Sequence, residues 1–127
     1  MTLLTQISCK PEISLELLAE PLEERGTIVH CRLTMACLLR ISPLTFLIQD
    51  DWQCRPLVSA YEIVQAPEWD FAAPDHRFTL VFEGLDSGCQ HFDLLEDTKE
   101  PYPFHFTGIS RNKTDVYHLE YPNFSLE

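Results

Sequence analysis

The chain has 127 residues, 45% of them hydrophobic, and its 20 acidic against 9 basic residues give a net charge of −11. This acidity, without any cluster of Lys or Arg, argues against a chain that binds nucleic acid or an anionic membrane surface. No run of about 18 apolar residues is present, so we expect no membrane insertion. The length is typical of one domain, and we expect a single domain over residues 1–127, with 1–12 and 122–127 at its periphery.

The first half of the chain is predicted to hold short strands. Residues 13–19 alternate in polarity between two prolines, which favours a strand, with a short helix as the alternative. Residues 27–36 predict a half-buried strand. Its expected inward-facing residues are Val29, Cys31, Leu33 and Met35. Residues 44–49 are apolar on both faces, which suggests a central strand, and residues 57–65 give another strand. Residues 66–75 predict an ordered loop held by docking of Trp69 or Phe71.

The second half opens with two strands around a turn, over residues 76–97. Apolar residues alternate in the first strand (Phe78, Leu80, Phe82) and in the second (Phe92, Leu94). The sequence Asp86-Ser87-Gly88 between them is typical of turns, so we expect an antiparallel hairpin. A proline-bearing loop over 98–103 and two last strands over 104–109 and 115–121 follow.

These elements amount to seven to nine strands with regular turn signals. That spacing predicts an all-β fold, an antiparallel immunoglobulin-like β-sandwich.

Four short motifs resemble those of a known family of domains. They are the segments 27–31 (TIVHC), 78–85 (FTLVFEGL), 92–96 (FDLLE) and 104–109 (FHFTGI). In this order they resemble a small immunoglobulin-like β-sandwich domain of Bacteroidetes-type proteins, often found ahead of thioredoxin-like domains. The resemblance implies a sandwich architecture and an accessory, non-catalytic role.

No catalytic or cofactor motif is present. The chain has no G-x-S-x-G elbow, P-loop or HExxH, so we expect no enzymatic activity and no cofactor. Its five cysteines include no CxxC pair, and free thiols are the favoured interpretation. Two metal sites are conceivable, but solvated or surface positions are favoured for both sets of residues, so we expect no metal. The sets are Asp93, Glu96, Asp97 and Glu100 for calcium, and Cys89, His91, His105 and His118 for zinc.

Several aromatic residues lie in or beside the predicted loops. The candidate binding residues are Trp69, Phe71, Trp52 and Tyr102. Packing over the core is the alternative role for such residues, and a binding surface is the best-motivated functional one. We therefore expect a non-enzymatic interaction module that binds a protein partner through these aromatics or a sheet edge. The alternative is a small-ligand or metal-binding domain.

The N-terminal sequence bears on the cellular compartment. Without a basic region and a long apolar stretch at the N-terminus, the chain as written is expected in the cytoplasm. A mature form whose signal peptide had been removed would instead lie in the periplasm or at the surface. The sequence leaves the oligomeric state open.

Overall fold

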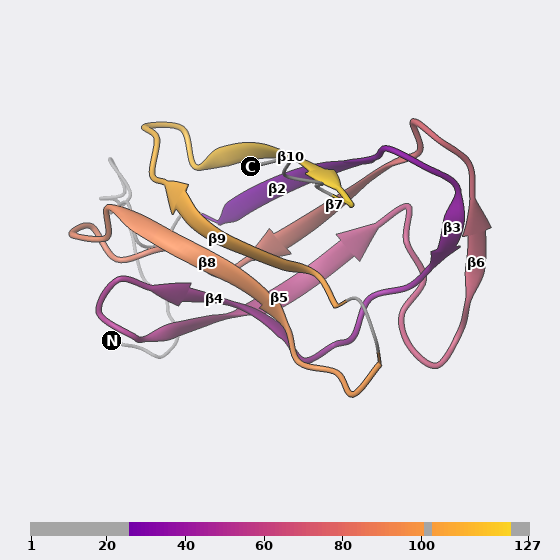
Figure 1. The fold of residues 1–127 in the computed structure, drawn as a ribbon. Helices are drawn as coiled ribbons and strands as arrows, with labels where there is room; N and C mark the ends of the chain where they lie inside the picture. The colour runs from indigo at the N-terminus through magenta and orange to yellow at the C-terminus, as the bar shows by residue number, and fades with distance from the viewer. Residues whose placement is uncertain (1–25, 101–102, 123–127) are drawn as a thin grey trace, which may run out of the picture.

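A computed structural model describes residues 26–100 and 103–122, which form strands and no helix (Figure 1). The predicted strand at 13–19 and Tyr102 lie outside the described residues. Nine strands are described: β2 (Thr27–Leu33), β3 (Cys37–Leu39), β4 (Thr45–Gln49), β5 (Cys54–Tyr61), β6 (Asp70–Ala72), β7 (Arg77–Phe82), β8 (His91–Glu96), β9 (His105–Ser110) and β10 (Val116–Tyr121). The predicted all-β class is confirmed.

Seven strands form one sheet in the order β10-β2-β7-β5-β4-β8-β9, and β3 pairs with β6 in a second, small sheet. The expectation of a purely antiparallel fold is wrong, because β10 pairs with β2 in parallel. Only residues 111–115 join β9 to β10, and so few residues span at most about 22 Å. The large sheet must therefore curl until its two outer strands approach, as Figure 1 shows.

The hairpin predicted over residues 76–97 is also wrong, although both of its strands exist. β7 pairs with β2 and β5, whereas β8 pairs with β4 and β9. Residues 83–90 connect them, and this connection is longer than a tight hairpin turn. It contributes Leu85, which is fully buried. The alternating pattern therefore identified the two strands and their inner faces but not their neighbours.

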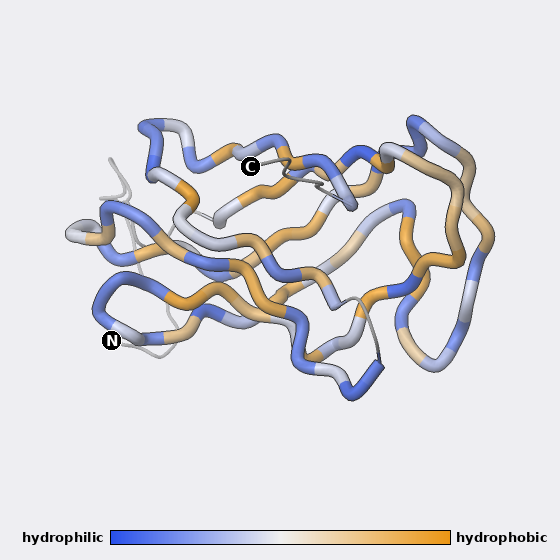
Figure 2. Tube along the Cα trace, in the orientation of Figure 1, coloured by the Kyte–Doolittle hydropathy of each residue, from blue (hydrophilic) through white to orange (hydrophobic). Residues whose placement is uncertain are grey.

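The core lies inside the curl of the sheet and is built from buried apolar residues of most of its strands, along which hydrophobic positions recur in Figure 2. Val29, Cys31 and Leu33 are buried as predicted, but Met35 is exposed because β2 ends at Leu33. The central position predicted for residues 44–49 is confirmed by β4, which lies between β5 and β8.

The strand predicted over 57–65 lies earlier in the chain, at Cys54–Tyr61. In the structure Pro56 lies within β5, where its carbonyl accepts a hydrogen bond from the Glu83 amide at 3.1 Å. The strand ends before Glu62, whose φ of 63° turns the chain away from extended geometry.

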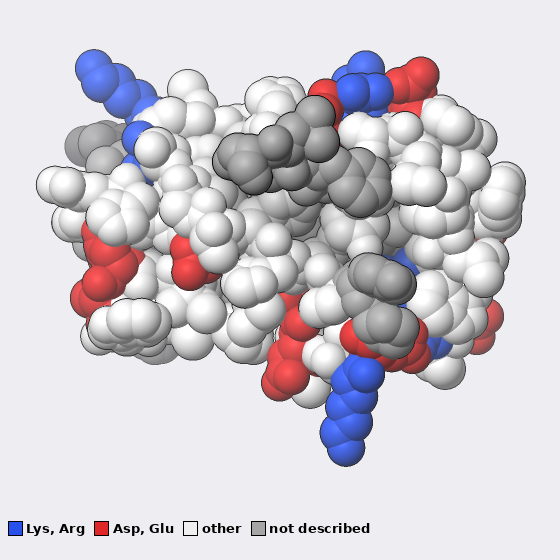
Figure 3. Space-filling model, viewed as in Figure 1, with Lys and Arg blue, Asp and Glu red and all other residues white. Residues whose placement is uncertain are grey.

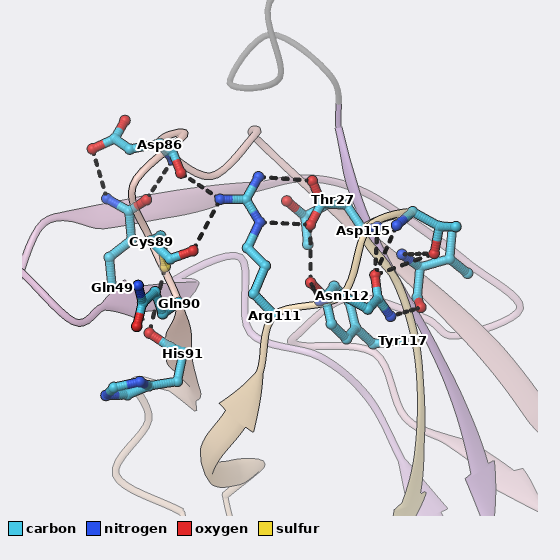
Figure 4. A network of polar contacts seen from close by, with 12 residues as sticks. Thr27, Gln49, Asp86, Cys89, Gln90, His91, Arg111, Asn112, Asp115 and Tyr117 are labelled. Carbon is cyan, nitrogen blue, oxygen red and sulfur yellow. Dashed lines mark hydrogen bonds and ion pairs between the residues drawn. The ribbon is translucent and has the colours of Figure 1, made fainter.

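A buried ion pair anchors the loops at one end of the curled sheet (Figure 4). Asp115 is completely buried, and its two carboxylate oxygens accept hydrogen bonds from the Arg111 guanidinium at 2.9 and 3.0 Å. The Tyr117 hydroxyl donates to the same carboxylate at 2.9 Å. Arg111 also donates to the backbone carbonyls of Asp86 and Cys89, which lie in the β7–β8 connection. The pair thus joins the β9–β10 loop to the loop that follows β7.

Alkaline pH is expected to destabilise this fold. Burial raises the pKa of Cys31 from 9.0 to about 12, and burial likewise raises the pKa of Tyr117 to about 12. The unfolded chain releases these protons at lower pH than the folded chain, so stability falls as the pH rises from 9.0 toward 12. Urea unfolding across this pH range should show a smaller fall in the free energy of unfolding for Cys31→Val than for the wild type. Equal falls would contradict the assignment to Cys31.

Candidate protein-binding surface

The small sheet exposes apolar side chains on one of its faces. Leu38 of β3 and Phe71 of β6 are register partners, so their side chains lie next to each other on the same face. Both are exposed, at 62% and 68%. Side chains alternate between the two faces of a strand, and accordingly the neighbouring Leu39 and Ala72 are buried. The buried residues hold the small sheet against the rest of the protein, and the opposite face is left to solvent.

Two further apolar residues extend this surface. Met35 precedes β3 and Trp69 precedes β6, and each is roughly half exposed. We call Met35, Leu38, Trp69 and Phe71 the β3–β6 apolar face. Large contiguous apolar surfaces are uncommon on single proteins and usually mark interaction sites.

Trp69 is held in place by a cation. The guanidinium carbon of Arg40 lies 3.9 Å from the centroid of the Trp69 ring. Arg40 in turn forms an ion pair with Glu100 and donates a hydrogen bond to the carbonyl of Pro67 at 2.9 Å. The indole is therefore fixed while its exposed part faces solvent, which lowers the entropy that an incoming partner would otherwise lose.

A cavity of about 910 Å³ adjoins the β3–β6 apolar face. Three residues of the face, Met35, Leu38 and Trp69, also line the cavity. The rest of the described lining comes from the strands β3, β8, β9 and β10 and from the segments that follow β3, β5, β8 and β10. These residues are Cys37, Leu39, Arg40, Ser42, Ala66, Glu96, Thr98, Glu100, Pro103, Phe104, His105, Phe106, Tyr121 and Pro122. The lining is mostly apolar with a few polar groups, which is the composition of ligand and side-chain pockets.

The polar groups of the cavity mainly serve the fold. Glu96 is buried, and its carboxylate accepts hydrogen bonds from the amides of Ser42 at 2.8 Å and Phe104 at 3.0 Å. Burial raises the pKa of the Cys37 thiol, so that thiol stays protonated at neutral pH. Burial also raises the pKa of Tyr121. Neither Cys37 nor Tyr121 is thus prepared as a nucleophile or base.

The structure brings together some of the predicted binding residues. Trp69 and Phe71 belong to one surface, although the loop predicted to contain them includes the strand β6. Trp52 is 82% exposed in the β4–β5 connection, at the opposite end of the molecule from β3 and β6 in Figure 1. The alternative of packing over the core holds for Phe104, which is buried against Phe78 and Tyr121.

Sequence reasoning missed Met35 and Leu38. Met35 was predicted to face inward, and Leu38 belongs to an apolar stretch without regular alternation. Their exposure depends on where β2 ends and β3 begins. The sequence carries no periodic signal for their exposure, because the apolar stretch 35–39 (MACLL) lacks the alternation that separates an exposed face from a buried one.

The residues considered for metal binding do not assemble. Cys89 is buried in the turn before β8, whereas His91 is exposed, so the two do not share a face. His118 stacks on His30 of the neighbouring strand, with ring centroids 5.2 Å apart. Within residues 26–100 and 103–122 no group of three or more His, Cys, Asp or Glu side chains is arranged to hold a metal ion. The four cysteines in these ranges are free thiols.

Comparisons with known proteins identify no relative of the chain. No protein-family model, no curated protein and no solved structure matches the chain. The described part of the chain also contains no helix that is long and apolar enough to cross a membrane.

Proposed function

We propose that this chain is a non-enzymatic interaction module that binds a partner protein through the β3–β6 apolar face. The observation that supports this most strongly is the exposed pair of Leu38 and Phe71 beside the fixed ring of Trp69. Burying such side chains stabilises a complex by roughly 25 cal/mol per Å² of apolar area, and rigid aromatics lose little entropy on binding. A protein partner supplies the apolar area that this requires.

Other exposed apolar residues are weaker candidates. Trp52 is more exposed than any residue of the β3–β6 apolar face, but it lies far from the other candidate aromatics, on the hairpin that joins β4 to β5. Single exposed apolar residues are normal on protein surfaces. The net charge of −11 also supports a protein partner over nucleic acid.

The proposal includes the immunoglobulin-like sandwich and the accessory role implied by the resemblance to the Bacteroidetes-type domains. The nine short strands within residues 26–100 and 103–122, which surround one apolar core, support a sandwich-like architecture. The parallel pairing of β10 with β2 differs from the purely antiparallel arrangement that was expected.

A second candidate function is supported by the cavity. Its volume of about 910 Å³ lies within the range of small-molecule sites, roughly 300–1,000 Å³. In that case a small apolar ligand would bind between the small sheet and β9. Native mass spectrometry of the freshly purified protein would reveal such a ligand as an added mass that disappears on denaturation.

Substitutions in the β3–β6 apolar face are expected to abolish partner binding. We expect Phe71→Asp and Trp69→Ala each to reduce recovery of a stoichiometric partner from lysate of the source cells by roughly tenfold or more. Trp52→Ala is the matched control, because it removes an exposed tryptophan elsewhere on the molecule and should leave recovery unchanged. Equal recovery by all three variants and the wild type, measured by quantitative mass spectrometry, would refute the proposed surface.

A further inference from the structure

We infer that the cavity binds a small organic amine, whose apolar body packs against the aromatic walls and whose ammonium group contacts the Glu96 carboxylate. This inference rests on the second candidate function, the binding of a small ligand, and it specifies the chemical class of that ligand. The site can be tested apart from partner binding, because Phe71, the most exposed residue of the β3–β6 apolar face, is not among the residues that line the cavity.

The first argument is the position of Glu96 on the inner face of β8. Side chains alternate along this strand, and Glu96 lies on the same face as the buried Phe92 and Leu94. Glu96 is only 9% exposed, and it lines the cavity. A carboxylate at such a core-facing position costs free energy unless hydrogen bonds and an opposite charge compensate it.

The second argument is that Glu96 can accept further hydrogen bonds. Each of its two oxygens accepts one bond from a backbone amide, that of Ser42 at 2.8 Å or that of Phe104 at 3.0 Å. An ionised carboxylate offers about four acceptor positions, so these bonds leave others open. No Lys, Arg or His side chain within residues 26–100 and 103–122 forms an ion pair with Glu96. An ammonium group would supply both a donor and the missing opposite charge.

The third argument is the excess of negative charge in the cavity. Arg40 also lines the cavity, but it pairs with Glu100, so the charge of Glu96 is left unbalanced among the acidic and basic side chains of the described lining. Burial is the main cause of the raised pKa of Tyr121, and the charge of Glu96 adds to it, so that charge acts at the opposite wall. In Figure 3 acidic atoms gather beside the loop that follows β8, at the lower edge of the view. Such a field attracts cations.

The fourth argument is that the aromatic walls favour an organic cation over a metal ion. The rings of Phe104 and Phe106 both pack edge-on against Tyr121, with centroids 4.4 and 6.4 Å from it. Aromatic rings attract ammonium groups and also bury the hydrocarbon body of an amine. A metal ion would need several ligating side chains, and the described part of the chain contains no group of three that could hold one.

The test compares three probes with the same apolar body and different head groups, namely phenylbutylamine, phenylbutanol and phenylbutyrate. Isothermal titration calorimetry with the full chain measures the affinity for each. We expect the amine to bind about tenfold more tightly than the alcohol, and the carboxylate to bind most weakly. The comparison uses the wild type and therefore does not depend on the folding of a variant. Equal affinities for the amine and the alcohol, or no binding of the amine, would overturn the inference.

Substitutions assign the preference for the amine to Glu96. Glu96→Gln should bring the affinity for the amine down to that for the alcohol, whereas Glu83→Gln, at an exposed position that does not line the cavity, should leave the preference unchanged. Cys37→Phe, which fills part of the cavity, should weaken the binding of both probes roughly tenfold or more. Urea unfolding confirms that each variant is folded. A preference for the amine that persists in folded Glu96→Gln would refute the role of Glu96.

The outcomes separate this inference from the binding of a partner protein. Phe71→Asp should abolish recovery of the natural partner and leave the affinity for phenylbutylamine unchanged. If the wild type does not prefer the amine, the amine site is refuted and the protein-binding surface stands. If Phe71→Asp recovers the partner normally while the three probes rank as expected, the protein-binding function fails and the amine site stands.

Discussion

Asp115→Asn is expected to lower the free energy of unfolding by about 3–5 kcal/mol. The substitution keeps the shape of the side chain, and Asn tolerates the left-handed backbone of this position, whose φ is 56°. It removes the negative charge, however, and leaves the Arg111 guanidinium without its counter-ion. The Arg111 side chain is only 10% exposed, so water cannot replace that counter-ion. An uncompensated buried charge is among the most destabilising changes known in proteins.

The matched control is the ion pair between Arg32 and Asp75, which is more exposed than that of Arg111 and lies outside this network. Asp75→Asn, at a position that also has a positive φ, should leave the free energy of unfolding nearly unchanged, as the loss of exposed ion pairs usually does. Urea unfolding followed by tryptophan fluorescence measures both variants. A loss of less than about 1 kcal/mol in Asp115→Asn would mean that the network in Figure 4 does not anchor the loops.

Phe92→Ala is the second substitution with a large expected effect, a loss of about 3–5 kcal/mol. Phe92 lies on β8 and is 1% exposed, and its ring packs edge-to-face on Tyr117 of β10 at 5.0 Å. Four strands separate β8 from β10 in the order of the sheet. This contact therefore exists only because the sheet curls, and its removal leaves a cavity at the place where the two ends of the sheet meet.

Phe46→Ala provides the comparison. Phe46 lies on the neighbouring strand β4, but it is only half buried. Its side chain points to the face of the sheet opposite to that of the buried Thr45 and Leu47. Phe46→Ala should therefore lower the free energy of unfolding by clearly less than Phe92→Ala. Chemical denaturation of the two variants, with the m-value compared to that of the wild type, checks this. Equal losses would indicate that Phe92 does not occupy the interior of a curled sheet.

The faces of the strands could be predicted from the sequence, but their partners could not. The alternation of Phe78, Leu80 and Phe82 correctly placed these residues inside, because a period of two follows directly from strand geometry. The same alternation says nothing about which strand lies alongside. The predicted β7–β8 hairpin failed for this reason, and the parallel pairing of β10 was unforeseen.

Two of the four residues of the β3–β6 apolar face were predicted from the sequence. Trp69 and Phe71 were identified because they lie in a predicted loop and not in the alternation of a strand. Met35 was assigned to the core because no Gly or Pro marks the end of β2 at Leu33, so the alternation seemed to continue. The role of Asp115 was missed as well, because an acidic residue at the start of a predicted strand is normally exposed.

The central claim is that the β3–β6 apolar face contacts the partner, and site-specific photo-cross-linking in the source cells tests it most directly. A photoreactive phenylalanine analogue in place of Phe71 should cross-link to one discrete protein, and the same analogue in place of Trp52 should not. Both positions are exposed, so the comparison controls for random encounters. A discrete product from the Trp52 position, with none from the Phe71 position, would contradict the account.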